Sequence, residues 1–158
     1  MKILVFVEGT ILMHSAEDKK NDFASYVAIG DAAKKIETWV EAGAEISYLT
    51  SRIKFLEIKQ IKDVLKKFNF PGDTVHARQE GESYKKVVEE IKPDVLVEDD
   101  CKSIGGTDII SIHLNQELRI NGIVVPEFAG IDFLPDDPEE LKNYGRKEET
   151  VKVKDDTY

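Results

Sequence analysis

Groups that could bind a metal ion and a phosphate follow short apolar runs at three separate points of the chain. Residues 8–10 (Glu-Gly-Thr) follow the apolar run 3–7, residues 50–52 (Thr-Ser-Arg) follow a second run, and residues 98–100 (Glu-Asp-Asp) follow a third. Lys85 lies shortly before the third run. Carboxylate oxygens are the ligands that Mg²⁺ prefers, and hydroxyl and ammonium groups donate to phosphoryl oxygens. The chain therefore carries the parts of a phosphate-handling site, provided that these segments meet in space.

The hydrophobic pattern predicts the elements that would bring them together. Continuous apolar runs rich in branched side chains are typical of strands buried on both faces. We expect strands over residues 3–7, 46–49, 74–77, 95–97, 109–112 and 123–125. Apolar residues at helical spacing predict helices over residues 29–40, 58–68 and 84–91. Residues 11–27 show no period, and we expect a loop or a small flap there.

Strands that alternate with helices predict an α/β fold with a doubly wound, Rossmann-like parallel sheet in a three-layer sandwich. We expect a single domain over residues 1–144 and a polar C-terminal tail over residues 145–158, in which Val151 and Val153 could form a short edge strand. Ligands of such sheets bind beyond the carboxyl ends of the strands, close to the point where the strand order reverses. That is the edge at which the acidic and hydroxyl-bearing segments should lie.

Charge and composition narrow the classes of partner. The 158 residues carry a formal net charge of -9, which argues against a nucleic-acid ligand because phosphate backbones require clustered Lys and Arg. A small phosphate-bearing molecule or a protein partner remains compatible with this charge. No apolar stretch approaches the length of a membrane span, so we expect no membrane contact. The single cysteine, Cys101, predicts a cytoplasmic protein without an internal disulfide.

The ordered segments resemble the sequence motifs of the haloacid dehalogenase-like (HAD) superfamily, most members of which are magnesium-dependent phosphohydrolases with an aspartate nucleophile. The first motif, Asp-x-Asp-Gly-Thr, falls on "FVEGT" at residues 6–10, and the second falls on Thr50 in "YLTSR". The third, a lysine, falls on Lys85 in "ESYKKVVEEI", with Lys86 as the alternate, and the fourth falls on residues 98–100. The match runs from residue 1 to about residue 100, with gaps too short for a large cap domain.

The resemblance implies a role for each matched residue. Glu8 takes the acid/base position, with Thr50 and Lys85 as the other catalytic groups. Phosphate-binding groups are implied at Gly9, Thr10, Thr50, Ser51 and Lys85. A weakly held Mg²⁺ is implied at Glu8, Asp99 and Asp100, and Asp99 is the first choice because it follows the strand where the metal-binding aspartate of the family stands.

One departure decides what chemistry the resemblance can carry. Phe6 stands where the family has its nucleophile, and a phenyl ring can neither attack phosphorus nor ligate a metal. The first hypothesis is therefore a catalytically impaired binder of a phosphate-bearing ligand, a metal or a partner. The second is an atypical phosphohydrolase in which Glu8 or Asp99 activates a metal-bound water. A receiver-like domain fits less well, because "TVHARQE" lacks a phosphorylatable aspartate after the third strand.

Several of these residues also have purely structural interpretations. Phe6 is expected to be a core residue of its strand or to line the former pocket, and Lys85 could be a solvated helix lysine. The adjacent acids at 98–100 should repel one another and raise one another's pKa. Their negative charge should also raise the pKa of the Cys101 thiol, which makes it a poor nucleophile. We expect the three histidines to be structural or exposed, because they lack zinc-like spacing.

Overall fold

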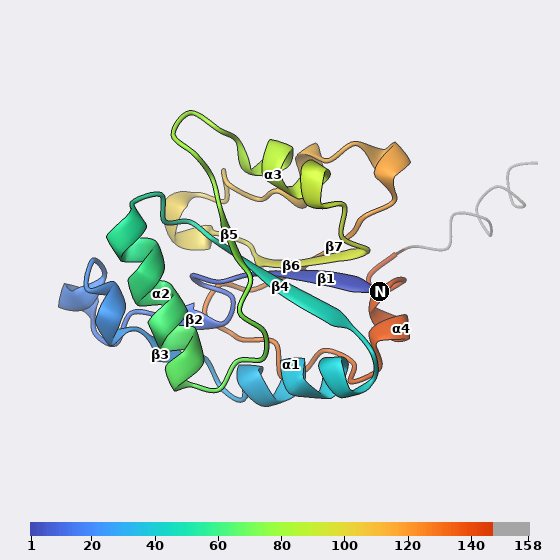
Figure 1. The fold of residues 1–158 in the computed structure, drawn as a ribbon. Helices are drawn as coiled ribbons and strands as arrows, with labels where there is room; N and C mark the ends of the chain where they lie inside the picture. The colour runs from blue at the N-terminus through green and yellow to red at the C-terminus, as the bar shows by residue number, and fades with distance from the viewer. Residues whose placement is uncertain (147–158) are drawn as a thin grey trace, which may run out of the picture.

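The computed structural model describes residues 1–146, and its centre is a parallel sheet of five strands (Figure 1). The strands lie in the order β5-β4-β1-β6-β7, and every neighbouring pair is parallel. Their bounds are β1 Lys2–Phe6, β4 Glu45–Thr50, β5 Val75–Ala77, β6 Val95–Asp99 and β7 Asn121–Val125. The predicted α/β class with a Rossmann-like parallel sheet is therefore confirmed.

Helices cover both faces of this sheet (Figure 1). The buried side chains of α1 (Ala32–Glu41) and α2 (Phe55–Lys67) belong to one hydrophobic cluster, and those of α3 (Tyr84–Ile91) belong to another. A short helix, α4 (Pro138–Leu141), packs its Leu141 into the first cluster. None of the helices within residues 1–146 has the length and apolar composition needed to cross a membrane.

Strand β1 lies in the middle of the sheet, between the two clusters. Val5 and Val7 point into the cluster with α1 and α2, whereas Leu4 and Phe6 point into the cluster with α3. Successive side chains of a strand alternate between faces, so a central strand covered by helices on both sides must be apolar at every position. This packing explains the continuous apolar run at residues 3–7.

The segment between β1 and α1 forms a small flap, as predicted. Strands β2 (Leu12–Met13) and β3 (Val27–Ala28) pair in an antiparallel ribbon. Two 3-10 turns, η1 (Glu17–Lys19) and η2 (Phe23–Ser25), lie between them. The connection from β4 to α2 is only a few residues long, so neither position carries a large cap domain.

The structure corrects one expected strand and leaves one untested. Residues 109–112 do not join the sheet; the 3-10 turn η4 (Ser111–His113) begins within them. The backbone amides of Ile110 and Ser111 donate to the Glu98 carboxylate, and this satisfies donors that a strand would have used. Further 3-10 turns are η3 (Lys102–Ile104) and η5 (Gln116–Leu118). The proposed edge strand at Val151 and Val153 lies outside the described residues.

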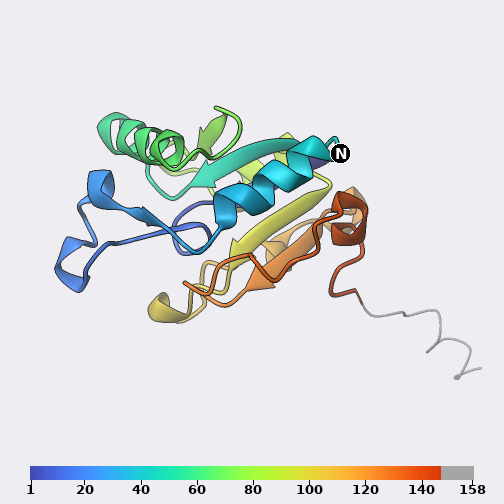
Figure 2. The ribbon, with the colours of Figure 1, turned by 90° about the horizontal axis from the view of Figure 1, so that it is seen from below.

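The strand order reverses between β1 and β6. From β1 the chain moves outward to β4 and then β5, and it then returns past β1 to β6 and β7. All five strands run toward the end of the sheet opposite the N-terminus (Figure 2). Glu8 follows β1, and Asp99 ends β6, so the two carboxylates flank the reversal point at which parallel sheets usually bind their ligands.

Candidate functional site

A cleft of about 460 Å³ lies at the carboxyl ends of β1 and β6, and we call it the strand-end cleft. Its wall combines aromatic rings with carboxylates. The rings belong to Phe6, His14, Tyr26, Tyr84 and Phe128, and the carboxylates belong to Glu8, Glu17, Asp99, Asp108 and Glu127. The ammonium group of Lys20 also lines the cleft. Gly9 and Ser51, two of the residues expected to bind phosphate, also line the cleft. The folding of the chain thus brings together groups from six separate segments of the sequence.

The carboxylate of Glu8 is held by the end of β4. The Thr50 hydroxyl donates to one of its oxygens, and the Ser51 amide nitrogen donates to the other at 2.9 Å. Thr50 is fully buried, so its hydroxyl is committed to Glu8 and does not reach the cleft. Burial raises the pKa of Glu8 despite these two hydrogen bonds, which act in the opposite direction. A carboxylate with a raised pKa and a fixed orientation is suited to exchange a proton.

Asp99 lies deeper, and its carboxylate is fixed against the first turn after β1. Thr10 Oγ1 donates to one oxygen at 2.7 Å, and the amide nitrogen of Cys101 donates to the other at 3.1 Å. A Cβ atom on Gly9 would lie 2.9 Å from both carboxylate oxygens of Asp99, so only glycine fits at this position. Burial is the main cause that raises the pKa of Asp99. Thr10 is fully buried and therefore supports Asp99 instead of lining the cleft.

Three carboxylates come close enough to hold one cation. Oxygens of Asp99, Asp100 and Glu127 lie within 4.8 Å of one another. The amide and hydroxyl of Ser103 donate to Glu127 at 2.7 and 2.9 Å, and Asp100 accepts the Glu127 amide at 3.1 Å. Three oxygen ligands on an acidic edge match the preference of Mg²⁺. These residues therefore fit the metal implied by the sequence resemblance.

This acidic group contains two of the three residues that the sequence resemblance implied as metal ligands. Glu8 is not among the three carboxylates, because Thr50 and Ser51 turn its side chain toward β4. Glu127 takes its place from the loop after β7. The sequence carries a signal for this residue. Glu127 stands two residues after the apolar run 123–125, just as Asp99 stands two residues after the apolar run 95–97.

Lys85 does not join the strand-end cleft, and neither does the alternate Lys86. Lys85 Nζ lies 3.2 Å from Glu89 with its side chain 48% exposed, and Lys86 pairs with Glu82 and Glu90. Tyr84 reaches the cleft instead, and its ring meets Phe6 edge-on at a centroid distance of 5.5 Å. Successive helix residues point about 100° apart, so only one of three neighbours can face the sheet edge.

Phe6 is both a core residue and part of the wall of the cleft. Its ring is 8% exposed, packs with the α3 cluster and borders the cleft beside Glu8. Both structural interpretations of this residue thus apply together. The position expected for a nucleophile holds an apolar ring at the edge of the acidic group.

Burial, more than mutual repulsion, governs the other titratable groups near the cleft. Burial is the largest cause that raises the pKa of Glu98, and the charge of Asp99 adds to it. Glu98 itself is structural, because its two oxygens accept the amides of Ile110 and Ser111, each at 2.8 Å. Burial also raises the pKa of the Cys101 thiol to about 12, with further contributions from Asp99 and Glu98. The direction predicted for Cys101 is confirmed, but its main cause is burial.

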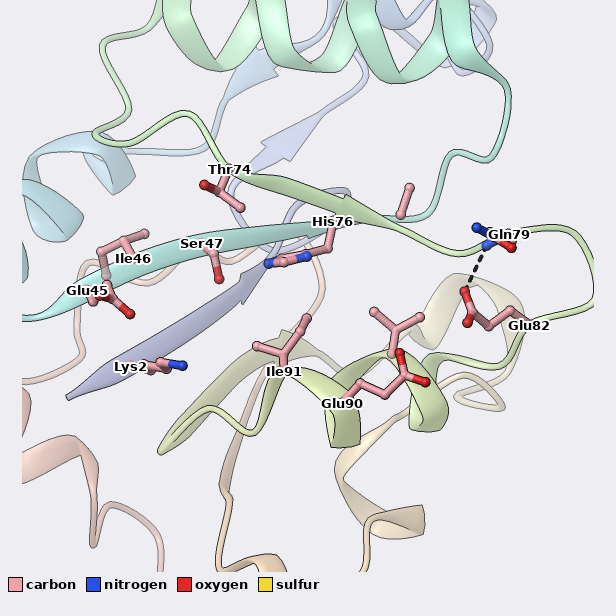
Figure 3. Close-up of a pocket in the computed structure, with 12 residues that line it drawn as sticks. Lys2, Glu45, Ile46, Ser47, Thr74, His76, Gln79, Glu82, Glu90 and Ile91 are labelled. Carbon is pink, nitrogen blue, oxygen red and sulfur yellow. Dashed lines mark hydrogen bonds between the residues drawn. The ribbon is translucent and has the colours of Figure 1, made fainter.

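A larger groove of about 610 Å³ lies elsewhere, between β4, β5 and α3 (Figure 3). His76 points into this groove, with Lys2, Ser47 and Glu90 around it (Figure 3). Lys2 and Glu45, the first residues of β1 and β4, also line this groove, so it reaches the amino ends of these strands. We assign the candidate site to the smaller strand-end cleft, because the buried, hydrogen-bonded carboxylates converge there.

The raised pKa values predict how stability depends on pH. Burial raises the pKa values of Glu8 and Asp99 above their ordinary values of 4.5 and 3.8. Between the ordinary and the raised pKa values, the native state therefore binds more protons than the unfolded chain. The stabilisation is complete below the unfolded pKa values and is lost as pH rises through the native ones. In metal-free buffer we therefore expect the melting temperature to fall by several degrees from about pH 5 to about pH 7.5.

The Glu8→Gln variant checks the cause of this slope. Glutamine keeps both hydrogen-bond partners of Glu8 but does not titrate, so part of the decrease in melting temperature should disappear. Glu41→Gln, a substitution at an exposed residue of α1, serves as the control and should retain the full decrease. An identical slope in Glu8→Gln and wild type would show that Glu8 does not carry the effect.

Comparisons with known proteins bear on the fold alone. No protein-family model and no curated protein matches this chain. It is similar to a chain of the "Structure of the Pnkp1/Rnl/Hen1 RNA repair complex", with a TM-score of 0.58, 14% identity, and coverage of 80% of this chain and 42% of that one. A chain of the "Structure of Pnkp1/Rnl/Hen1 complex" gives a TM-score of 0.55 with 12% identity, over 80% and 47%. This chain thus spans less than half the length of either neighbour.

Proposed function

We propose that this protein has a HAD-like phosphatase fold and binds a divalent metal and a phosphate-bearing ligand in the strand-end cleft, without aspartyl-phosphate chemistry. Two observations support the proposal. Glu8 and Gly9 of the first motif, Asp99 of the fourth, and Ser51, which follows the second-motif residue Thr50, line a single cleft. The observation that carries the functional conclusion is Phe6, whose apolar ring borders this cleft where a carboxylate nucleophile would be required.

The residues of the cleft have separable roles in this proposal. Asp99, Asp100 and Glu127 would hold Mg²⁺. A bound Mg²⁺ would offset the negative charge of the ligand and of the acidic wall. Thr10 and Gly9 orient Asp99, and Thr50 orients Glu8. The Ser51 hydroxyl and the Lys20 ammonium line the cleft and are available to contact phosphoryl oxygens. The hydroxyls of Thr10 and Thr50 are buried, and the amides of Gly9 and Ser51 already donate to Leu12 and Glu8.

A metal-dependent phosphohydrolase that uses water directly is the second candidate. It is favoured by the raised pKa values of Glu8 and Asp99, which suit a group that accepts a proton from water. The two candidates differ in turnover but share the metal and the ligand. Metal-dependent hydrolysis by the wild-type protein would favour the second, and binding without turnover would favour the first.

Binding of Mg²⁺ itself tests the part that both candidates share. We expect millimolar Mg²⁺ to raise the melting temperature of the wild-type protein, because a ligand that binds only the native state stabilises it. Asp99→Asn should lose this increase, since it removes charge from the centre of the acidic group while Thr10 and Cys101 can still bond to the amide.

The matched control is Asp63→Asn, which removes a carboxylate from an exposed position on α2. It should keep the full Mg²⁺ shift. Equal shifts in wild type and Asp99→Asn would remove Asp99 from the metal site and contradict the proposed function.

The partner that we propose is a small phosphate-bearing molecule or a protein, and not a nucleic acid. The two structural neighbours are chains of RNA repair complexes, so RNA is the nucleic acid with which to test this choice of partner. A net charge of -9 offers no basic stripe to release counterions. We expect no change in the fluorescence anisotropy of a labelled single-stranded RNA at physiological salt. Tight, salt-sensitive binding would overturn this choice of partner.

A further inference from the structure

A second pocket adjoins the strand-end cleft and has a different electrostatic character. Its volume is about 460 Å³, and we call it the Arg78 pocket. Tyr84 and Asp108 line both cavities. The Arg78 pocket carries the side chains of Arg78, Lys85 and His113, and Asp108 is the only carboxylate that residues 1–146 contribute to its wall. The two cations of this wall, Arg78 and Lys85, outnumber its carboxylate, although the protein has a net charge of -9.

Arg78 is held against an aromatic ring and forms no ion pair with the residues that the structure describes. It follows β5, and its guanidinium carbon lies 3.8 Å from the centroid of the Tyr84 ring. None of the ion pairs within residues 1–146 involves Arg78. Its Nε atom is also buried without a hydrogen-bond acceptor among these residues. Arg52 also has a buried Nε without an acceptor in this part of the chain and lies over the ring of Phe23, but it differs from Arg78 in that its guanidinium lies 3.6 Å from the Glu57 carboxylate.

An arginine that stacks on an aromatic ring keeps its remaining N–H groups in one plane, ready for an oxyanion. Leaving such a group unpaired beside a cavity costs free energy unless a ligand or water satisfies it. Lys85 can add a second positive charge, because its contact with Glu89 is an exposed i,i+4 ion pair of small energetic value. The lysine that the sequence pattern singled out for phosphate thus lies in the wall of this pocket and not in the strand-end cleft.

We propose that the Arg78 pocket is a metal-independent binding site for a phosphoryl group, with Arg78 as the main ligand and Lys85 as the second. The site differs from the strand-end cleft in that its charge is positive without a bound cation. The Ser83 hydroxyl, which accepts the Lys86 amide, also lines this pocket and keeps its proton free to donate. The proposal does not depend on the proposed function, and the two can be tested apart because one requires metal and the other does not.

The experiment is a titration with inorganic phosphate in buffer that contains EDTA and physiological NaCl, followed by calorimetry or by ³¹P NMR. We expect the wild-type protein to bind with a Kd of about 1–10 mM, the range of a few charge-assisted hydrogen bonds. Arg78→Gln should weaken binding at least about tenfold and Lys85→Gln about threefold. Asp63→Asn should bind as wild type does, because Asp63 is an exposed residue of α2 that does not line this pocket.

Two controls make the outcome decisive. Lys59→Gln removes an exposed lysine that also pairs with an i,i+4 carboxylate, and it should leave binding unchanged. Arg78→Gln removes the contact with the Tyr84 ring and could disturb the local packing. Lys85→Gln changes only an exposed side chain, so it tests the pocket even if the Arg78 variant is destabilised. No saturable binding by wild type in EDTA, or equal losses in Lys85→Gln and Lys59→Gln, would overturn the proposal. Phosphate binding in EDTA without any Mg²⁺ shift would instead contradict the proposed function alone.

Discussion

We expect the wild-type protein to hydrolyse p-nitrophenyl phosphate with Mg²⁺ no faster than buffer, and Phe6→Asp to gain measurable, Mg²⁺-dependent hydrolysis. The substitution places a carboxylate at the edge of the strand-end cleft, beside Glu8 and close to the group formed by Asp99 and its neighbours. A nucleophile allows a two-step path through a covalent intermediate, which Glu8 cannot replace because Thr50 and Ser51 hold it toward β4.

The same substitution should cost stability. Phe6 packs against Tyr84 and the α3 cluster, so its removal leaves a cavity and brings a carboxylate to a site that is 8% exposed. The expected loss in the free energy of unfolding is about 3 kcal/mol, to be partly recovered with Mg²⁺. Activity must therefore be measured below the melting transition of the variant, which a thermal scan in the same buffer establishes.

Phe6→Asn is the matched control, because it creates nearly the same cavity without a nucleophile. Only Phe6→Asp should form an acyl-phosphate, visible as a mass increase in protein quenched with acid. Turnover by Phe6→Asn equal to that of Phe6→Asp would show that the carboxylate is not the nucleophile. Robust turnover by wild type, lost in Asp99→Asn, would favour direct attack by metal-bound water.

The second large effect is expected for Gly9→Ala. Gly9 has φ +89°, and an added Cβ would lie 2.9 Å from both oxygens of the Asp99 carboxylate. The positive φ alone costs a non-glycine residue about 1–2 kcal/mol. Displacing Asp99 would also break its hydrogen bond with the buried Thr10 hydroxyl, for a further loss of about 2 kcal/mol. The Mg²⁺-dependent thermal shift should disappear as well.

Gly43→Ala separates the two contributions. Gly43 has φ +101°, and no atom of the described part of the chain lies within 4 Å of the Cβ that it would gain. It therefore carries the backbone strain without the clash. Urea denaturation should show that Gly9→Ala loses about 2 kcal/mol more than Gly43→Ala. Equal losses would mean that Asp99 moves freely and that its position is not fixed by the first turn.

The sequence by itself determined the strands and helices that build the sheet. The run at residues 3–7 and the run at 95–97 are apolar at every position because β1 and β6 are covered on both faces. The helical spacing in residues 84–91 matches α3. The order of residues along the chain also shows that acids follow β1 and β6. This order is enough to predict which edge of the sheet should carry the site. The short segment 109–112 was the exception, because its amides bind the distant Glu98.

Only the tertiary structure decided which of these residues face one another. Thr50 turns Glu8 away from the acidic group, and Glu127 joins that group from the loop after β7. The rotation of α3 directs Tyr84 to Phe6 and leaves Lys85 beside Arg78. Sequence spacing fixes where a residue lies along its own strand or helix. The direction of its side chain depends on hydrogen bonds and packing from segments far away in the chain, and these contacts form only when the sheet and its helices assemble.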